Sequence, residues 1–96
     1  MLRAKRAPQL RFILAEGVAN AVRHGRATRI TVTIELDAGL WVEIRDNGSA
    51  DAAAGAAPRA QAAPFSLRQR VREMGGGCSL TVDADGGTLV VALPAN

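Results

Sequence analysis

The chain has 96 residues, with 12 Lys and Arg against 9 Asp and Glu, a formal charge of +3, and 48% hydrophobic but only 3% aromatic residues. A chain of this length forms one small domain, since domains usually need about 100 residues, and this excludes a multidomain enzyme. No uncharged stretch approaches the roughly 20 apolar residues that cross a bilayer. Charged residues also interrupt the start where a signal peptide would be apolar, so we expect a cytoplasmic domain without a membrane segment.

The charge and the cysteine content limit the kinds of binding site that the chain could hold. Cys78 is the single cysteine, so it forms no internal disulfide and matches no metal-ligand spacing. In the first 29 residues Lys and Arg face one acidic residue, Glu16. Such a bias is typical of surface decoration, of phosphate binding or of nucleic-acid binding. The scarcity of aromatic residues argues against a nucleic-acid platform, which would stack bases on aromatic rings.

The first half of the chain predicts a helix followed by a hairpin. Apolar residues recur at three- and four-residue spacing over residues 9–25, which predicts an amphipathic helix that ends near Gly25. Alternating patterns over residues 30–36 and 40–45 predict two strands, and the turn residues 37–39 between them predict antiparallel pairing.

The second half of the chain predicts a loop, then again a helix followed by a hairpin. Residues 49–64 are Ala-rich without periodicity and predict a mobile loop. Ser66 and Gln69 resemble a capping box at the start of a short helix that ends at the glycines 75–77. Strands are expected over residues 78–83 and 88–93, joined by a turn at 85–87. Helices on one face of a four-stranded, mixed but mainly antiparallel sheet make a two-layer α+β sandwich of one domain, residues 1–96.

Polar residues at regular spacing mark a candidate site on the first helix. Glu16, Asn20 and His24 are four residues apart and therefore share one flank of the helix. Their oxygen and nitrogen atoms suit a hard cation such as Mg²⁺ and a proton acceptor. Taken alone, this spacing is more typical of a solvated helix face. Likewise, residues 46–48 and 86–88 are each, taken alone, common turn sequences.

Taken together, these segments resemble the ATP-binding domain of sensor histidine kinases, within the gyrase, heat-shock chaperone, histidine kinase and MutL ATPase group. AEGVANAVRHGRATRITVTI is similar to the N box and its following strand, IRDNG to the first glycine box, and GGTLVVALP to the last box and strand. SLRQRVREMGG resembles the helix after the nucleotide lid in the subfamily that acts with NarL-type response regulators. The resemblance implies the Bergerat-type ATP-binding fold.

The resemblance also implies roles for individual residues. Asn20 would bind the Mg²⁺ that bridges the ATP phosphates, and Glu16 would act as base or polariser for the histidine that receives the γ-phosphoryl group. Asp46 would accept the adenine amino group, and guanine would be rejected because it places an acceptor oxygen there. Gly48 would let the base lie against the backbone, Thr88 would support Asp46 and the adenine, and His24 would have a structural or phosphate-contacting role.

The chain departs from the family pattern in the lid, residues 49–64, which is interpreted as a degenerate ATP lid. Residues 61–63 are Gln-Ala-Ala where the family has Gly-x-Gly, and Ser49-Ala50 replaces a usual second glycine. Such glycines let backbone amides hold phosphates. Arg59, Arg68 or Arg70 would be the residues available to contact phosphates instead.

The leading hypothesis is the catalytic domain of a two-component histidine kinase, which binds ATP and Mg²⁺. Because His24 is the single histidine and lies in the N box, the phosphoacceptor must be on a separate dimerisation domain, and a response regulator would follow. Two alternatives stay open: a non-catalytic interaction module of the same fold, and an anti-sigma-factor-like serine kinase. The strand expected before the first helix is absent or reduced to residues 1–8, so we expect a minimal or excised catalytic domain.

Overall fold

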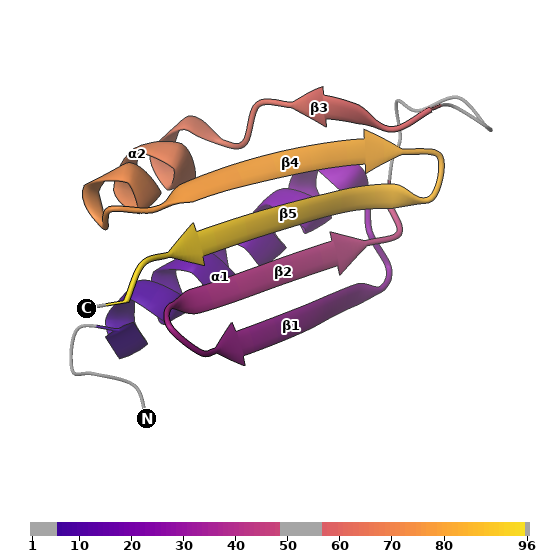
Figure 1. Cartoon of the computed structure of the whole chain (residues 1–96). Coiled ribbons are helices and arrows are strands. Elements are labelled where there is room, and N and C mark those ends of the chain that lie inside the picture. Colours follow the sequence, from indigo (N-terminus) through magenta and orange to yellow (C-terminus); the bar gives the residue numbers. More distant parts are fainter. Residues whose placement is uncertain (1–5, 49–56, 96) are drawn as a thin grey trace.

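A computed structural model describes residues 6–48 and 57–95, without the side chain of His24. The described residues form two layers, a five-stranded sheet and two helices that lie on one of its faces (Figure 1). In chain order the elements are α1 (Arg6–Gly25), β1 (Ile30–Leu36), β2 (Leu40–Asp46), β3 (Arg59–Gln61), α2 (Phe65–Glu73), β4 (Gly77–Asp83) and β5 (Gly86–Leu93). The two-layer α+β prediction is confirmed.

The strand order is β1-β2-β5-β4-β3, and every pairing among the described strands is antiparallel. Two hairpins, β1–β2 and β4–β5, therefore meet at the centre of the sheet, where Leu40 pairs with Leu93 and Arg45 with Thr88. This register brings the end of β2 beside the start of β5.

Two local predictions were wrong. The prediction of four strands missed β3, which lies inside the stretch expected to be a loop. The three residues of β3 pair with β4, and the local composition gives no sign of that pairing. The capping box at Ser66 is also absent, because α2 begins at Phe65 with Pro64 as its N-cap and no side-chain cap. The amide of Arg68 already donates to the Pro64 carbonyl at 2.9 Å, so Ser66 lies within the helix.

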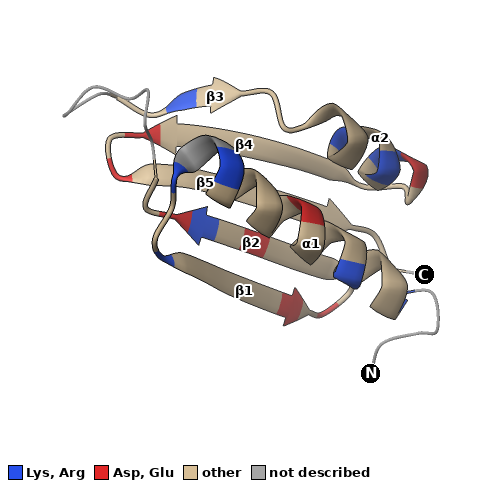
Figure 2. Cartoon of the chain, turned by 180° about the vertical axis from the view of Figure 1, so that it is seen from behind, with Lys and Arg blue, Asp and Glu red and all other residues tan. Residues whose placement is uncertain are grey.

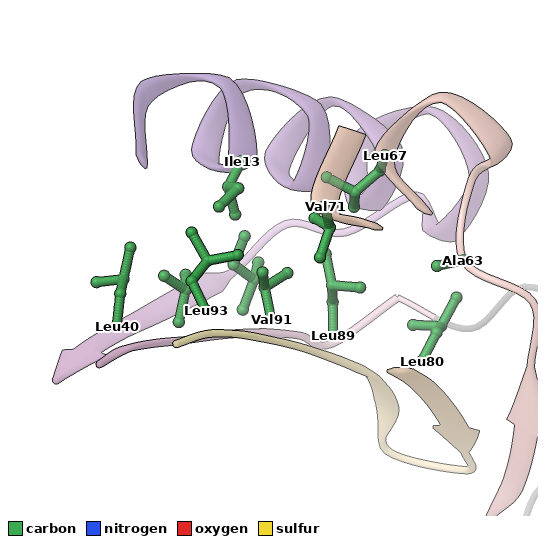
Figure 3. Close-up of a cluster of buried hydrophobic side chains, with 11 residues drawn as sticks. Ile13, Leu40, Ala63, Leu67, Val71, Leu80, Leu89, Val91 and Leu93 are labelled. Carbon is green, nitrogen blue, oxygen red and sulfur yellow. The ribbon is translucent and has the colours of Figure 1, made fainter. Parts of the chain in front are cut away.

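The core lies between the helices and alternate residues of the central strands (Figure 3). The buried members are Ile13, Leu40, Val42, Ile44, Ala63, Leu67, Val71, Leu80, Leu89, Val91 and Leu93. Gly17 brings α1 close to this layer, because a Cβ atom there would overlap Ile44 Cδ1. The helix therefore lies over β2 and the central strand β5.

Candidate functional site

The predicted site residues gather at one end of the sheet. α1 and β2 run in the same direction and end on the same side of the molecule, where β4 also turns into β5 (Figure 1). We call this region the Asp46 end, defined by residues 26–29, 46–48 and 83–87. Asn47 joins two of its segments: its Oδ1 accepts from the amides of Thr28 and Arg29 at 2.9 and 3.0 Å, and its Nδ2 donates to Thr28 Oγ1 at 3.0 Å.

Asp46 is held by backbone amides from both sides. Its Oδ1 accepts from the amide of Gly48 at 2.9 Å and from the amide of Gly87 at 3.3 Å. Its Oδ2 receives no hydrogen bond from a described residue and is half-buried with the rest of the side chain. The carboxylate is therefore fixed in direction and keeps one oxygen available as an acceptor.

Two glycines of β5 make this arrangement possible. Gly86 has a φ of 138°, and a Cβ atom there would overlap the Asp46 carbonyl oxygen. At Gly87 a Cβ atom would lie 3.0 Å from Asp46 Oδ2, which is tight contact. Glycine thus serves here for close approach to the residue predicted to select the base.

Thr88 is not brought to Asp46. Side chains alternate along a strand, and Leu89, Val91 and Leu93 of β5 point into the helix layer, so Thr88 points to the opposite face. There it is directly opposite Arg45 and Thr81. Gly87 occupies the position beside the carboxylate. From the sequence, Gly87 was not assigned to this position beside Asp46. The alternation along β5 indicates it, because Gly87 and the buried Leu and Val residues of β5 are all odd-numbered and therefore lie on the same face.

Glu16 and Asn20 lie half-buried on the flank of α1 that faces α2. Phe12, one turn before Glu16, marks this flank because the guanidinium carbon of Arg70 lies 4.6 Å from its ring centroid. Asn20 is roughly one and a half turns before the end of α1, which is near Asp46. Among the described residues, no hydrogen bond joins Glu16 or Asn20 to Asp46. The side chain of His24 lies outside the described residues.

The donor set fits magnesium bound with a nucleotide rather than a metal held by the protein alone. Within the described part of the chain no group of three or more His, Cys, Asp and Glu gathers as a metal cluster. Asn20 and Glu16 offer oxygen atoms from one helix flank. Mg²⁺ commonly takes one or two protein oxygens and completes its shell with phosphate and water, which matches this limited set.

The three arginines considered as phosphate contacts differ in the contacts that their side chains already make within the protein. Arg68 Nε donates to the Ala63 carbonyl at 2.9 Å, and its guanidinium lies 5.7 Å from the Phe65 ring. Arg70 lies over Phe12 and 3.8 Å from a Glu73 oxygen. Arg59 is exposed on β3 and makes no hydrogen bond, ion pair or ring contact with another described side chain. It pairs with Val82 near the Asp46 end, so of these three arginines Arg59 is the one free to meet a ligand there.

The stretch without lid glycines is built into the fold. Gln61 belongs to β3, and Ala63 is buried in the core and held through its carbonyl by Arg68. Residues 61–63 therefore form a fixed support before α2. Ser49 and Ala50, the other departure from the family pattern, lie outside the described residues.

The comparisons with known proteins agree with this geometry. Residues 5–96 match the family model described as histidine kinase-, DNA gyrase B-, and HSP90-like ATPase. The chain belongs to this family. Among solved structures, the ATP-binding domain of PrrB from Mycobacterium tuberculosis superposes with a TM-score of 0.65 and 25% identity, covering 91% of this chain and 67% of that one. The family and the shared fold make this a histidine kinase-like ATPase domain.

Two observations concern regions outside the site. Burial raises the pKa of the Cys78 thiol, and the nearby Arg68 partly opposes this. A raised pKa leaves less thiolate, as expected for a thiol that is half-buried against the core. In addition, none of the helices among the described residues has the length and apolar character needed to cross a membrane.

Proposed function

We propose that this ATPase domain is the catalytic domain of a two-component histidine kinase, which transfers the ATP γ-phosphoryl group to a histidine on a separate dimerisation domain. The observation that carries the proposal is the fixed Asp46 carboxylate at the same end of the molecule as the polar flank of α1. Membership of the family and the fold shared with the PrrB ATP-binding domain support it.

Asp46 is the residue proposed to select adenine. With Oδ1 saturated by two amides, Oδ2 is the oxygen that accepts from an exocyclic amino group. Guanine would present a carbonyl oxygen to the same atom, and two acceptors facing each other leave both without a partner. Gly48 is buried beside this carboxylate and lets a planar base approach the backbone.

The α1 flank is proposed to serve the phosphate end of the nucleotide. Asn20 would hold Mg²⁺, which supplies charge stabilisation to the phosphates when bound. Glu16 is proposed to orient or deprotonate the accepting imidazole of the partner domain. Phosphoryl transfer depends mainly on positioning and electrostatics, so a small domain with these few groups is sufficient. Arg59 would add a phosphate contact.

Calorimetric titration with Mg-ADP and Mg-GDP tests base selection. We expect ADP to bind the wild type and GDP not to bind, and Asp46→Asn to lose most ADP affinity because an amide NH₂ would meet the adenine amino group. Asp85→Asn is the matched control, since it removes the same charge from an exposed turn at the same end. Equal ADP affinity in wild type and Asp46→Asn would refute the assignment.

A second assay separates the possible reactions. Incubation with ATP, Mg²⁺ and a dimerisation-helix domain should yield a phosphoryl group that is labile in acid and stable in base, as expected for phosphohistidine. Acid-stable phosphate on a partner serine would favour the serine kinase. Nucleotide binding without transfer to any acceptor would favour the non-catalytic module, for which the alanine at the buried position 63 is the supporting observation.

A further inference from the structure

Asn47 is followed directly by a glycine at the exposed end of β2. The chain has three asparagines, and Asn47 is the one that precedes a glycine, whereas Asn20 precedes Ala21. Asparagine is a thermally labile residue. A following glycine has no side chain to keep its backbone nitrogen away from the asparagine carboxamide, so that nitrogen can attack the side-chain carbon Cγ. Asn47 is exposed, so water has access to it.

The attack at this pair leads to deamidation. The nitrogen of Gly48 loses its proton to hydroxide and forms a bond to Cγ of Asn47, while the bond from Cγ to Nδ2 breaks. The leaving amide nitrogen takes a proton from solvent and departs as ammonia, and a five-membered succinimide ring remains. Water then opens the ring at either carbonyl group, which leaves aspartate or isoaspartate at position 47. The sum is the exchange of ammonia for water, without an oxidant or a reductant.

In the folded protein the Asn47 carboxamide is held by the connection that follows α1. Its Oδ1 accepts from the amides of Thr28 and Arg29 at 2.9 and 3.0 Å, and its Nδ2 donates to Thr28 Oγ1 at 3.0 Å. This connection enters β1 beside the end of β2 (Figure 2). An approach of Gly48 to Cγ turns the carboxamide toward its own backbone, and the three hydrogen bonds oppose that rotation.

The nitrogen of Gly48 is also restrained. It donates to Asp46 Oδ1 at 2.9 Å, and Gly48 is buried. The nitrogen attacks only after it has lost its proton. A neighbouring carboxylate disfavours that loss, because it accepts the hydrogen bond from the N–H form and repels the negative charge of the deprotonated form. Thr28 therefore holds the group that is attacked, and Asp46 holds the nitrogen that attacks.

We propose that Asn47 is a deamidation site that the folded Asp46 end keeps closed, and that the reaction proceeds when this end opens locally. Local opening costs less free energy than unfolding of the whole domain, so it supplies the reactive state more often. The reaction needs hydroxide and water alone, so it does not depend on a bound nucleotide.

Isoaspartate at position 47 changes the surroundings of the Asp46 carboxylate. It adds one carbon atom to the main chain between position 47 and Gly48. The Gly48 nitrogen then moves from its place beside Asp46 Oδ1, and that oxygen keeps the amide of Gly87 alone. The modification thus loosens the carboxylate whose direction defines the site.

Peptide mass spectrometry during incubation in mildly alkaline buffer tests the protection, because it distinguishes asparagine from the two acidic products at each position. We expect Asn47 of the folded wild type to react at least about tenfold more slowly than Asn47 of the same chain unfolded in urea, since more than one hydrogen bond must break. Asn20 serves as the internal reference and should react more slowly than Asn47 in the unfolded chain. Equal rates for Asn47 in the folded and the unfolded chain would overturn the proposal.

Removal of a single restraint tests how the site is kept closed. Thr28→Val removes the contact with Nδ2 and keeps the backbone amide, so it should speed deamidation of the folded protein about two- to tenfold. Thr33→Val is the matched control, because it removes an exposed hydroxyl of β1 that is opposite Glu43, away from Asn47, and it should react at the wild-type rate. A folded Thr28→Val variant that reacts no faster than the wild type would contradict the assigned restraint.

Val71→Ala separates local opening from unfolding of the whole domain. Val71 is fully buried in α2, so the change lowers global stability without touching the Asp46 end, and the rate at Asn47 should stay at the wild-type level. Acceleration equal to that of Thr28→Val would show that the reaction requires global unfolding, against the proposal. Asp46→Ala releases the Gly48 amide and should also accelerate the reaction. Circular dichroism melts verify that each variant is folded, and an unchanged rate in folded Asp46→Ala would refute the role of the carboxylate.

Discussion

At the scale of single residues, the site depends on how the sheet presents Asp46. The carboxylate is directed by two amides, and the adjacent Asn47 joins β2 to the connection after α1. The sequence identified Asp46 and Gly48 as candidates by resemblance. It placed the supporting role on Thr88, because recognising Gly87 required knowing which face of β5 is buried.

Replacing Asn47 by alanine should cost about 1–2 kcal/mol of unfolding free energy. The variant loses three side-chain hydrogen bonds to Thr28 and Arg29, each worth about 0.5–1.5 kcal/mol when buried and less at this exposed position. Urea denaturation measures the change. Thr28→Val removes one of these bonds and should cost less; equal stability of the Asn47→Ala variant and the wild type would contradict the assigned role.

The two glycines of β5 should respond differently to alanine. Gly86→Ala imposes a φ of 138° on an L side chain and overlaps the Asp46 carbonyl, so it should cost about 2–4 kcal/mol. At Gly87→Ala the new methyl carbon meets the Asp46 side chain rather than backbone, with Oδ2 at 3.0 Å. This variant should be nearly neutral for stability but should weaken ADP binding by displacing the carboxylate. Denaturation combined with ADP titration separates the two effects, and a reversed order would show that Gly86 is under no strain.

At the scale of elements, α1 and four strands were predictable because their apolar periods are long and regular. β3 was not, because a three-residue strand has no measurable period and depends on β4 for its hydrogen bonds. The start of α2 was also displaced, since Pro64 fixes the backbone before Phe65 and leaves Ser66 no capping role. The pairing of β3 thus depends on a tertiary contact, whereas the start of α2 is set by the neighbouring Pro64.

Because α1 packs closely on the sheet, replacing a helix glycine by alanine should lower the stability of this protein instead of raising it. Alanine in place of a glycine inside a helix normally stabilises by up to about 1 kcal/mol. At Gly17 the new methyl group would overlap Ile44 Cδ1 and lie 3.1 Å from Leu89 Cδ2, so Gly17→Ala should instead cost about 1–3 kcal/mol. Ile44→Val removes Cδ1 and should recover part of that loss in the double variant, which a double-mutant cycle by urea denaturation would measure. Additive losses would mean that the helix moves away freely.

At the scale of the whole molecule, ligand binding and stability are linked. A ligand that binds only the folded state stabilises it by about 2.7 kcal/mol at 100 times its Kd. For a domain of this size that corresponds to a rise in Tm of about 10 °C or more. We expect Mg-ADP to raise the Tm of the wild type by this amount and to leave the Tm of Asp46→Ala unchanged. Scanning calorimetry provides the measurement, and an equal rise in both proteins would place the nucleotide elsewhere.

The central pairing of β2 with β5 also has a consequence for the order in which the protein assembles. The two hairpins are local and can form early, whereas Leu40 and Leu93 are far apart in the sequence and join only when a long loop closes. The bond from the Gly87 amide to Asp46 crosses this same seam. Nucleotide affinity should therefore appear only at the last step of refolding, and a rapid-mixing experiment with a fluorescent ADP would report the docking of the two halves directly.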